Sequence, residues 1–128
     1  MTGDKSGKRI LVVEDDPNIM RLIVDTLEGG GHVVTSARDS SEALARLGSG
    51  RFDAAIVDFV LPGSDGAQLH RKLRAIAPSL ADCTLFISGH LQSKENLDYF
   101  LTHGAGYLAK PFNAEDLLGS VDRIFEPT

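Results

Sequence analysis

Apolar residues follow two alternating patterns along the chain. Short unbroken runs of small or branched apolar residues, such as residues 54–57, are typical of strands buried on both faces of a sheet. Between these runs, apolar residues recur every three or four positions, as they do on one face of an amphipathic helix. The alternation predicts five strands, each followed by a helix, with the strands at residues 9–13, 32–37, 54–57, 84–88 and 106–109.

Capping residues mark where the predicted helices begin. Asp16 precedes Pro17 at the first helix, and Asp39 stands three residues before Glu42, which is the spacing of a capping box. The three glycines at 29–31 are expected to end the first helix. The last three helices are expected to begin at Ser64 or Asp65, at Ser93 and at Asn113.

Strands that alternate with helices in this way indicate a parallel sheet covered by helices on both faces. The predicted fold class is therefore α/β, a doubly wound (βα)5 sandwich of three layers with right-handed crossovers. In the third helix, Leu69, Leu73 and Ile76 are expected to lie on one apolar side, and the helix is expected to stop at Pro78. Residues 1–8 are expected to form a flexible leader, and residues 9–126 a single domain.

Composition and charge narrow the classes of function. The 128 residues are 42% hydrophobic and 24% charged, as in an ordinary globular domain, with no apolar run near the roughly 18 residues of a membrane span. A net charge of −5, with no basic cluster longer than residues 71–74, argues against direct binding of nucleic acid. The single cysteine, Cys83, excludes an internal disulfide and favours a cytoplasmic location.

Polar residues that carry chemistry follow four of the five predicted strands. Glu14 and Asp15 follow the first strand, Asp58 the third, Ser88 ends the fourth, and Lys110 follows the fifth. Because the carboxyl ends of parallel strands meet at one edge of a sheet, these side chains are expected to converge there. Three carboxylates in one cleft repel one another unless a cation intervenes. Mg²⁺ prefers such oxygen ligands, so the sequence predicts a magnesium site.

This set of residues favours phosphoryl transfer. The metal and Lys110 would draw charge from a phosphoryl group, which is most of what that chemistry requires of a protein. Asp58 could then attack phosphorus and carry an acyl phosphate. Ser88 could donate a hydrogen bond to a phosphoryl oxygen. Taken singly, each residue is equally well a helix cap, a strand-end hydroxyl or a solvated lysine, and it is their combination that carries the interpretation.

From Arg9 to Phe125 the chain resembles a bacterial two-component response-regulator receiver domain. The similarity rests on four segments in the family's order: Ile-Leu-Val-Val-Glu-Asp-Asp at 10–16, Ile-Val-Asp-Phe-Val-Leu-Pro-Gly-Ser-Asp-Gly at 56–66, Phe-Ile-Ser-Gly at 86–89 and Gly-Tyr-Leu-Ala-Lys-Pro-Phe at 106–112. The resemblance implies a flavodoxin-like sheet with strand order 2-1-3-4-5.

The resemblance also implies a ligand set and a partner. Asp58 would accept a phosphoryl group from the phosphohistidine of a histidine kinase or histidine phosphotransfer domain. Glu14, Asp15 and Asp58, together with the carbonyl of Val60, would hold Mg²⁺. Glu14 departs from the aspartate that is commoner in the family, which lengthens one ligand. Val60 is apolar where many relatives carry a polar side chain, a difference that bears on the lifetime of the phosphoryl group and not on its acceptance.

The remaining family motifs imply a switch. Lys110 matches the phosphate-contacting lysine, Pro111 matches the proline after it, which is often cis, and Ser88 and Tyr107 match the switch pair. The signalling surface would combine the helix that begins at Ser93, the strand at 106–109 and the helix that begins at Asn113. A homodimer, where one forms, is expected through the same surface. Such a domain is not an enzyme for other substrates, because it catalyses only its own phosphorylation and dephosphorylation.

Several alternatives stay open at this point. A haloacid-dehalogenase-like phosphatase would need a second aspartate two residues after Asp58, where Val60 stands. A flavodoxin-type carrier is disfavoured because acids follow the first strand, and a phosphorylation-independent receiver is disfavoured because every site residue is present. The chain could be a stand-alone regulator, a relay shuttle or part of a longer protein. The four histidines, which show no metal-ligand spacing, are expected at surface or turn positions: His32, His70, His90 and His103.

Overall fold

The computed structural model describes residues 7–61, 64–89, 98–99, 102–103 and 106–126. Its main sheet has five parallel strands in the order β2-β1-β3-β6-β7. Counted along the chain by themselves, these strands have the order 2-1-3-4-5, so the predicted topology is confirmed. Their bounds are β1 (Arg9–Val13), β2 (Val33–Ala37), β3 (Ala54–Asp58), β6 (Thr84–Ser88) and β7 (Gly106–Ala109).

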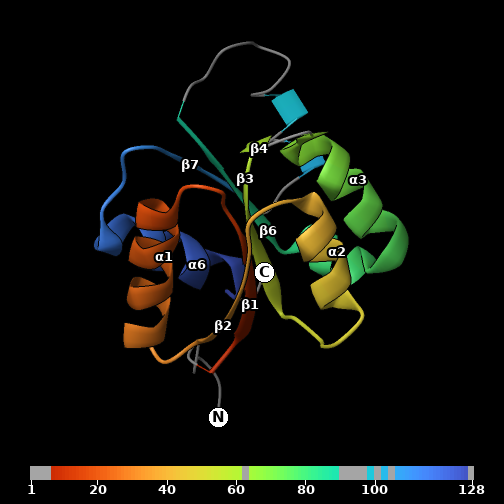
Figure 1. The fold of residues 1–128 in the computed structure, drawn as a ribbon. Coiled ribbons are helices and arrows are strands. Elements are labelled where there is room, and N and C mark those ends of the chain that lie inside the picture. Colours follow the sequence, from red (N-terminus) through yellow and green to blue (C-terminus); the bar gives the residue numbers. More distant parts are fainter. Residues whose placement is uncertain (1–6, 62–63, 90–97, 100–101, 104–105, 127–128) are drawn as a thin grey trace.

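Helices cover both faces of the sheet. Figure 1 shows α1 (Pro17–Gly29) and α6 (Ala114–Ile124) on one side, and α2 (Ser40–Leu47) and α3 (Gly66–Ile76) on the other. A short helix, α4 (Pro78–Asp82), packs on the same side as α3. The predicted three-layer sandwich is therefore confirmed. None of the helices described is long and apolar enough to cross a lipid bilayer.

The central strands are buried on both faces, as their unbroken apolar runs predict. In β3, Ala55 and Val57 contribute to the core cluster under α2 and α3, whereas Ala54 and Ile56 contribute to the cluster under α1 and α6. All four of these side chains are fully buried. Because successive side chains of a strand point to opposite faces, one strand supplies both cores.

Four helices begin at the capping residues that the sequence indicates. The Asp16 carboxylate accepts hydrogen bonds from two backbone N–H groups of the first turn of α1. Asp39, Asp65 and Asn113 each accept one from the residue three positions later, so Asp65, rather than Ser64, caps α3. The predicted cap Ser93 lies outside the described residues, although Asp98, Tyr99, Thr102 and His103 are helical.

Three features differ from the sequence-based predictions. An antiparallel ribbon of two short strands, β4 (Val60–Leu61) and β5 (Ser64–Asp65), follows β3. Helix α3 ends before Pro78 as expected, but Pro78 begins a further short helix, α4, that was not predicted from the sequence. Ile76 was predicted on the apolar side of α3 and is 61% exposed. Residues of α4 cover that end of the core, so the last turn of α3 has no apolar surface left to face.

Candidate functional site

Asp58 lies at the carboxyl end of β3 and is almost fully buried. Its Oδ1 accepts a hydrogen bond from the backbone N–H of Val60 at 3.0 Å. Its Oδ2 accepts one from the ammonium group of Lys110 at 2.9 Å. Both carboxylate oxygens are therefore oriented, one by the chain that turns into β4 and the other by the residue that follows β7.

Glu14 follows β1 and is 1% exposed. Its Oε2 accepts a hydrogen bond from the backbone N–H of Asp16 at 3.0 Å. Its Oε1 lies 2.9 Å from Lys110 Nζ in an ion pair, yet it accepts no aligned hydrogen bond from any residue that the structure describes. One ammonium group thus serves two buried carboxylates, and one buried oxygen is incompletely satisfied.

The pKa values of two groups at this site, Glu14 and Lys110, are both raised. Burial, partly opposed by the Asp16 N–H and by Lys110, raises the pKa of Glu14 to about 7, and the charge of Asp58 adds to the rise. Burial alone would lower the pKa of Lys110, but its contacts with Asp58 and Glu14 outweigh that effect and raise it. Lys110 therefore stays charged near neutral pH.

The carboxylates of Glu14, Asp15 and Asp58, hereafter the acidic cluster, fit a divalent cation. One oxygen of each lies within 4.8 Å of the others. Glu14 and Asp58 are buried, whereas Asp15 is exposed and faces solvent from which an ion can enter. Glu14 Oε1 has a free lone pair in this cluster. Hard oxygen donors with one side open to water are what Mg²⁺ prefers.

The other predicted site residues lie around this edge of the sheet. Ser88 ends β6 and is 3% exposed, and its carbonyl accepts a hydrogen bond from the Lys110 N–H at 2.9 Å. Tyr107 is half-buried on β7 and packs against the core cluster under α2 and α3. The Lys110–Pro111 peptide bond is cis. The side chain of Val60 is 64% exposed, and the part of its carbonyl in holding metal stays a prediction.

Sequence reasoning missed a set of rings behind Asp58. Phe59, His70, Phe86 and Tyr99, hereafter the aromatic cluster, pack with ring centroids 5.1 to 6.1 Å apart. His70 is 1% exposed, which corrects its predicted surface or turn position. Its place beside Leu69 and one turn before Leu73 was the available signal, because the position lies at the border of the apolar side of α3.

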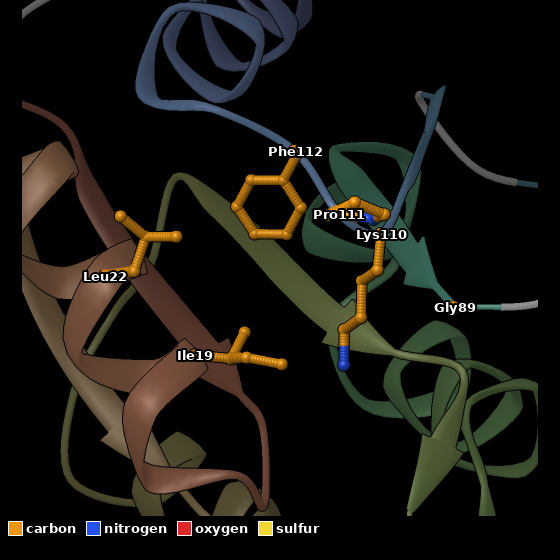
Figure 2. Close-up of a pocket in the computed structure, with 6 residues that line it drawn as sticks. All are labelled: Ile19, Leu22, Gly89, Lys110, Pro111 and Phe112. Atoms are coloured by element: carbon orange, nitrogen blue, oxygen red, sulfur yellow. The ribbon is translucent and has the colours of Figure 1, made fainter.

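An apolar pocket of about 260 Å³ adjoins the Lys110 side chain. Figure 2 shows Ile19 and Leu22 of α1 on one side, and Pro111 and Phe112 on the other. Leu22 is 41% exposed, so part of this apolar surface faces solvent. The surface next to the charged site is therefore apolar, and it is built from three segments far apart in the chain: α1, Gly89 and residues 110–112.

Comparison with known proteins identifies the family of the chain and agrees with the fold. The family model of the response regulator receiver domain matches residues 10–122. The response regulator receiver protein CpdR of Brucella abortus is 34% identical over 117 residues, which are 91% of this chain and 96% of CpdR. The transcriptional regulatory protein TcrA of Mycobacterium tuberculosis is 37% identical over 117 residues, but the match covers only 45% of TcrA.

Solved structures show the same likeness. The chemotaxis response regulator CheY4 of Vibrio cholerae superposes with a TM-score of 0.83 at 27% identity, covering 94% of this chain and all of CheY4. TrrA of Thermotoga maritima superposes with a TM-score of 0.80 at 28% identity, covering 92% of this chain and 99% of TrrA. The chain belongs to the response regulator receiver domain family. It is a phosphoacceptor receiver of two-component signalling, a class that takes phosphoryl groups from histidine kinases.

Proposed function

We propose that Asp58 is the residue that accepts the phosphoryl group. The observation that supports this assignment is the placement of a buried carboxylate whose two oxygens are held by Val60 N–H and Lys110 Nζ. An oriented nucleophile beside a fixed cation has the two properties that phosphoryl transfer requires, namely alignment and stabilisation of charge.

We further propose that the acidic cluster holds Mg²⁺ during the transfer. The unsatisfied Glu14 Oε1 and the spacing of the three carboxylates support this assignment. The similar protein TrrA was solved in complex with Mg²⁺ and beryllofluoride. Bound Mg²⁺ would neutralise charge on the phosphoryl oxygens and relieve the repulsion among the carboxylates.

The residues of the chain then divide the work. A carboxylate oxygen of Asp58 attacks phosphorus, the P–N bond of the donor phosphohistidine breaks, and the imidazole nitrogen keeps the electron pair and takes a proton. The Lys110 ammonium then pairs with the phosphoryl oxygens instead of the carboxylates. Ser88, at the end of the neighbouring strand, donates a hydrogen bond from its hydroxyl to the acyl phosphate.

The same acyl phosphate would operate the switch. A hydrogen bond from Ser88 would draw the end of β6 toward Asp58 and admit the ring of Tyr107, which β7 pairs beside Phe86. The change would appear on the surface that joins the Tyr99-bearing helical residues, β7 and α6. A response regulator of this kind uses that surface for its output partner or for a homodimer.

The apolar pocket beside Lys110 is the surface that we assign to the phosphodonor. Ile19, Leu22 and Phe112 offer apolar contacts at the mouth of the site, and Lys110 lines both the pocket and the acidic cluster. A donor helix of a histidine kinase or phosphotransfer domain, apolar on both sides of its histidine, would bury this surface while presenting the phosphohistidine to Asp58.

The site favours self-modification over turnover of other substrates. Val60 carries no group that transfers a proton, so a haloacid-dehalogenase-like phosphatase would lack its general acid and base two residues after the nucleophile. We therefore propose that the domain catalyses only the formation and hydrolysis of its own acyl phosphate.

Intact-mass analysis with acetyl phosphate tests the assignment. The wild-type protein should gain one phosphoryl group with Mg²⁺ and none after chelation, and Asp58→Asn should gain none. Asp53→Asn is a matched control, because Asp53 is an exposed carboxylate at the opposite end of the same strand. An Asp58→Asn protein that still gains a phosphoryl group would refute the assignment.

A further inference from the structure

A buried histidine and a tyrosine join α3 to the helical residues that precede β7. The His70 ring lies inside the core, with Nε2 2.8 Å from the carbonyl of Ala81 and Nδ1 3.0 Å from the Tyr99 hydroxyl. The same hydroxyl lies 3.4 Å from the carbonyl of Ala67. Tyr99 is thus tied to α3 by its polar end, whereas its ring lies among Phe59 and Phe86.

The two contacts determine which atoms carry the protons. A backbone carbonyl can only accept, so Nε2 of His70 must carry the hydrogen that reaches Ala81. Burial lowers the pKa of His70, and the neutral ring then has an acceptor at Nδ1. The Tyr99 hydroxyl is therefore the donor to His70. Phenylalanine at position 99 would leave a buried acceptor without a partner.

The Tyr99 ring bears on the residue that follows Asp58. Its centroid lies 6.1 Å from that of Phe59, and Phe59 packs edge-on against Phe86 at 5.7 Å. The backbone of Phe59 is held as well, because its N–H donates to Ile87 O at 2.8 Å and its carbonyl accepts from Gly66 N–H at 2.7 Å. Rings on one side and backbone hydrogen bonds on the other therefore fix Phe59.

The position of Phe59 determines the orientation of the Asp58 carboxylate. The two residues share a peptide bond, and Asp58 Oδ1 takes its hydrogen bond from Val60, the residue directly after Phe59. A shift of the Phe59 ring would turn the chain from Asp58 to Val60 and move the carboxylate away from Lys110. The route from the Tyr99-bearing helix to the nucleophile is thus one ring contact and one peptide bond long.

We propose that Tyr99, held by His70, is a positioning residue for phosphoryl acceptance, so that the Tyr99-bearing helix and the Asp58 carboxylate are energetically coupled through Phe59. This inference rests on the proposed role of Asp58. The hydrogen bond between His70 of α3 and Tyr99 is the polar connection. Through it, phosphorylation of Asp58 would change the position of the helical residues around Tyr99. By reciprocity, whatever binds the helix changes the affinity of the site.

Nitrogen NMR of the His70 ring measures directly whether the His70–Tyr99 hydrogen bond responds to the Asp58 site. On saturation with Mg²⁺ and beryllofluoride, which stands in for the phosphoryl group, the Nδ1 resonance of His70 should shift in the wild type and stay unchanged in Asp58→Asn. The ring of His32, which is buried but accepts from Lys8 N–H on another part of the molecule, is the internal control and should not respond.

Affinity for Mg²⁺–beryllofluoride distinguishes a positioning role of Tyr99 from a role in folding stability alone. Tyr99→Phe should weaken binding about three- to tenfold. The double variant His70→Leu/Tyr99→Phe removes Nδ1 together with its donor but leaves the Ala81 carbonyl without one, so its loss of stability should be smaller than the sum of the two single losses, and its binding should remain weak. Thr84→Val is the matched control, because Thr84 is a buried hydroxyl on β6 that bonds Leu80 O, so the variant loses stability without loss of affinity.

The outcomes distinguish this inference from the proposal beneath it. No response of the wild type to Mg²⁺–beryllofluoride would overturn the role of Asp58, and the coupling with it. A response in the backbone of Ser88 and Lys110, with unchanged His70 nitrogens and unchanged affinity in Tyr99→Phe, would overturn the coupling alone. Wild-type affinity in the double variant would show that the pair is only structural.

Discussion

Asp58 and Phe59 are consecutive residues, yet they belong to two buried clusters of opposite character. In the acidic cluster, two of the three carboxylates, those of Glu14 and Asp58, share the Lys110 ammonium, and Glu14 Oε1 accepts no aligned hydrogen bond within the described residues. In the aromatic cluster, both His70 nitrogens have partners, and the rings pack edge to face around them.

The contrast between the two clusters shows that unfavourable electrostatics are confined to the acidic cluster. Buried like charges and an oxygen without an aligned hydrogen bond cost stability, and such a cost is maintained where a ligand can relieve it. A fully satisfied polar network instead rigidifies the core and defines one arrangement. The aromatic cluster lies directly behind the acidic cluster, so a rigid part of the core supports the reactive Asp58 carboxylate.

The largest effect is expected from neutralising the acidic cluster. Since the pKa of Glu14 is raised from 4.5 to about 7, the folded protein binds more protons than the unfolded chain between these values, and stability falls as pH rises through them. Glu14→Gln should therefore stabilise the metal-free protein by about 1–3 kcal/mol at pH 8 and by little at pH 4.5. The same variant should weaken Mg²⁺ binding at least about tenfold.

Urea unfolding with and without Mg²⁺ measures both parts of that prediction. The exposed Glu115 is the control, because Glu115→Gln removes the same charge at the surface and should not stabilise the protein. A Glu14→Gln protein no more stable than the wild type at pH 8 would mean that the buried carboxylate is not under electrostatic strain.

The next largest effect should come from the contact between the clusters. A Cβ on Gly66 would lie 2.8 Å from the Phe59 Cα and 3.0 Å from the Asp58 carbonyl oxygen, both of them backbone atoms that cannot move aside cheaply. Gly66→Ala should therefore cost about 2 kcal/mol of stability and weaken Mg²⁺ binding. In Gly119→Ala, a helical glycine whose Cβ would meet only Arg123 at 3.7 Å, stability should rise instead.

The parts of the molecule that sequence predicts are those fixed by local pattern. The central strands carry unbroken apolar runs, and the side chains that follow parallel strands must meet at one edge, so Glu14, Asp58 and Lys110 are placed together without knowledge of distances. Caps such as Asp16 and Asn113 act within one helical turn and are equally readable.

The parts that sequence does not predict depend on contacts between distant segments. The burial of His70 follows from partners 11 and 29 residues away, Ala81 and Tyr99, which no periodicity reveals. The exposure of Ile76 follows from the position of α4, and the β4–β5 ribbon has two-residue strands that are too short to show alternation. The unequal satisfaction of Glu14 and His70 likewise depends on geometry, not on composition.

A smaller effect should come from unbalancing the aromatic cluster. Tyr99→Phe leaves Nδ1 of His70 buried without a donor and should cost about 1–2 kcal/mol. Adding His70→Leu removes the unpaired nitrogen but leaves the Ala81 carbonyl without its donor, so the two losses should be less than additive. A double-variant cycle by chemical unfolding measures this coupling, and strictly additive losses would show that the hydroxyl and the imidazole do not interact.

The smallest effect is a pH dependence that runs opposite to that of Glu14. Burial lowers the pKa of His70 below 6.5 in the folded protein, so as pH falls from about 6.5 the unfolded chain takes up a proton that the folded chain refuses. This difference lowers stability on acidification, whereas Glu14 raises it over part of the same range. His70→Leu should therefore shift the slope between pH 7.5 and 5.5 toward greater stability on acidification, because the contribution of Glu14 is then less opposed. His32 also has a pKa lowered by burial and should leave a residual slope, which His32→Gln removes separately. Equal slopes in the wild type and in His70→Leu would show that the imidazole protonates as readily in the core as in water, and the contrast between the two clusters would then be one of packing alone.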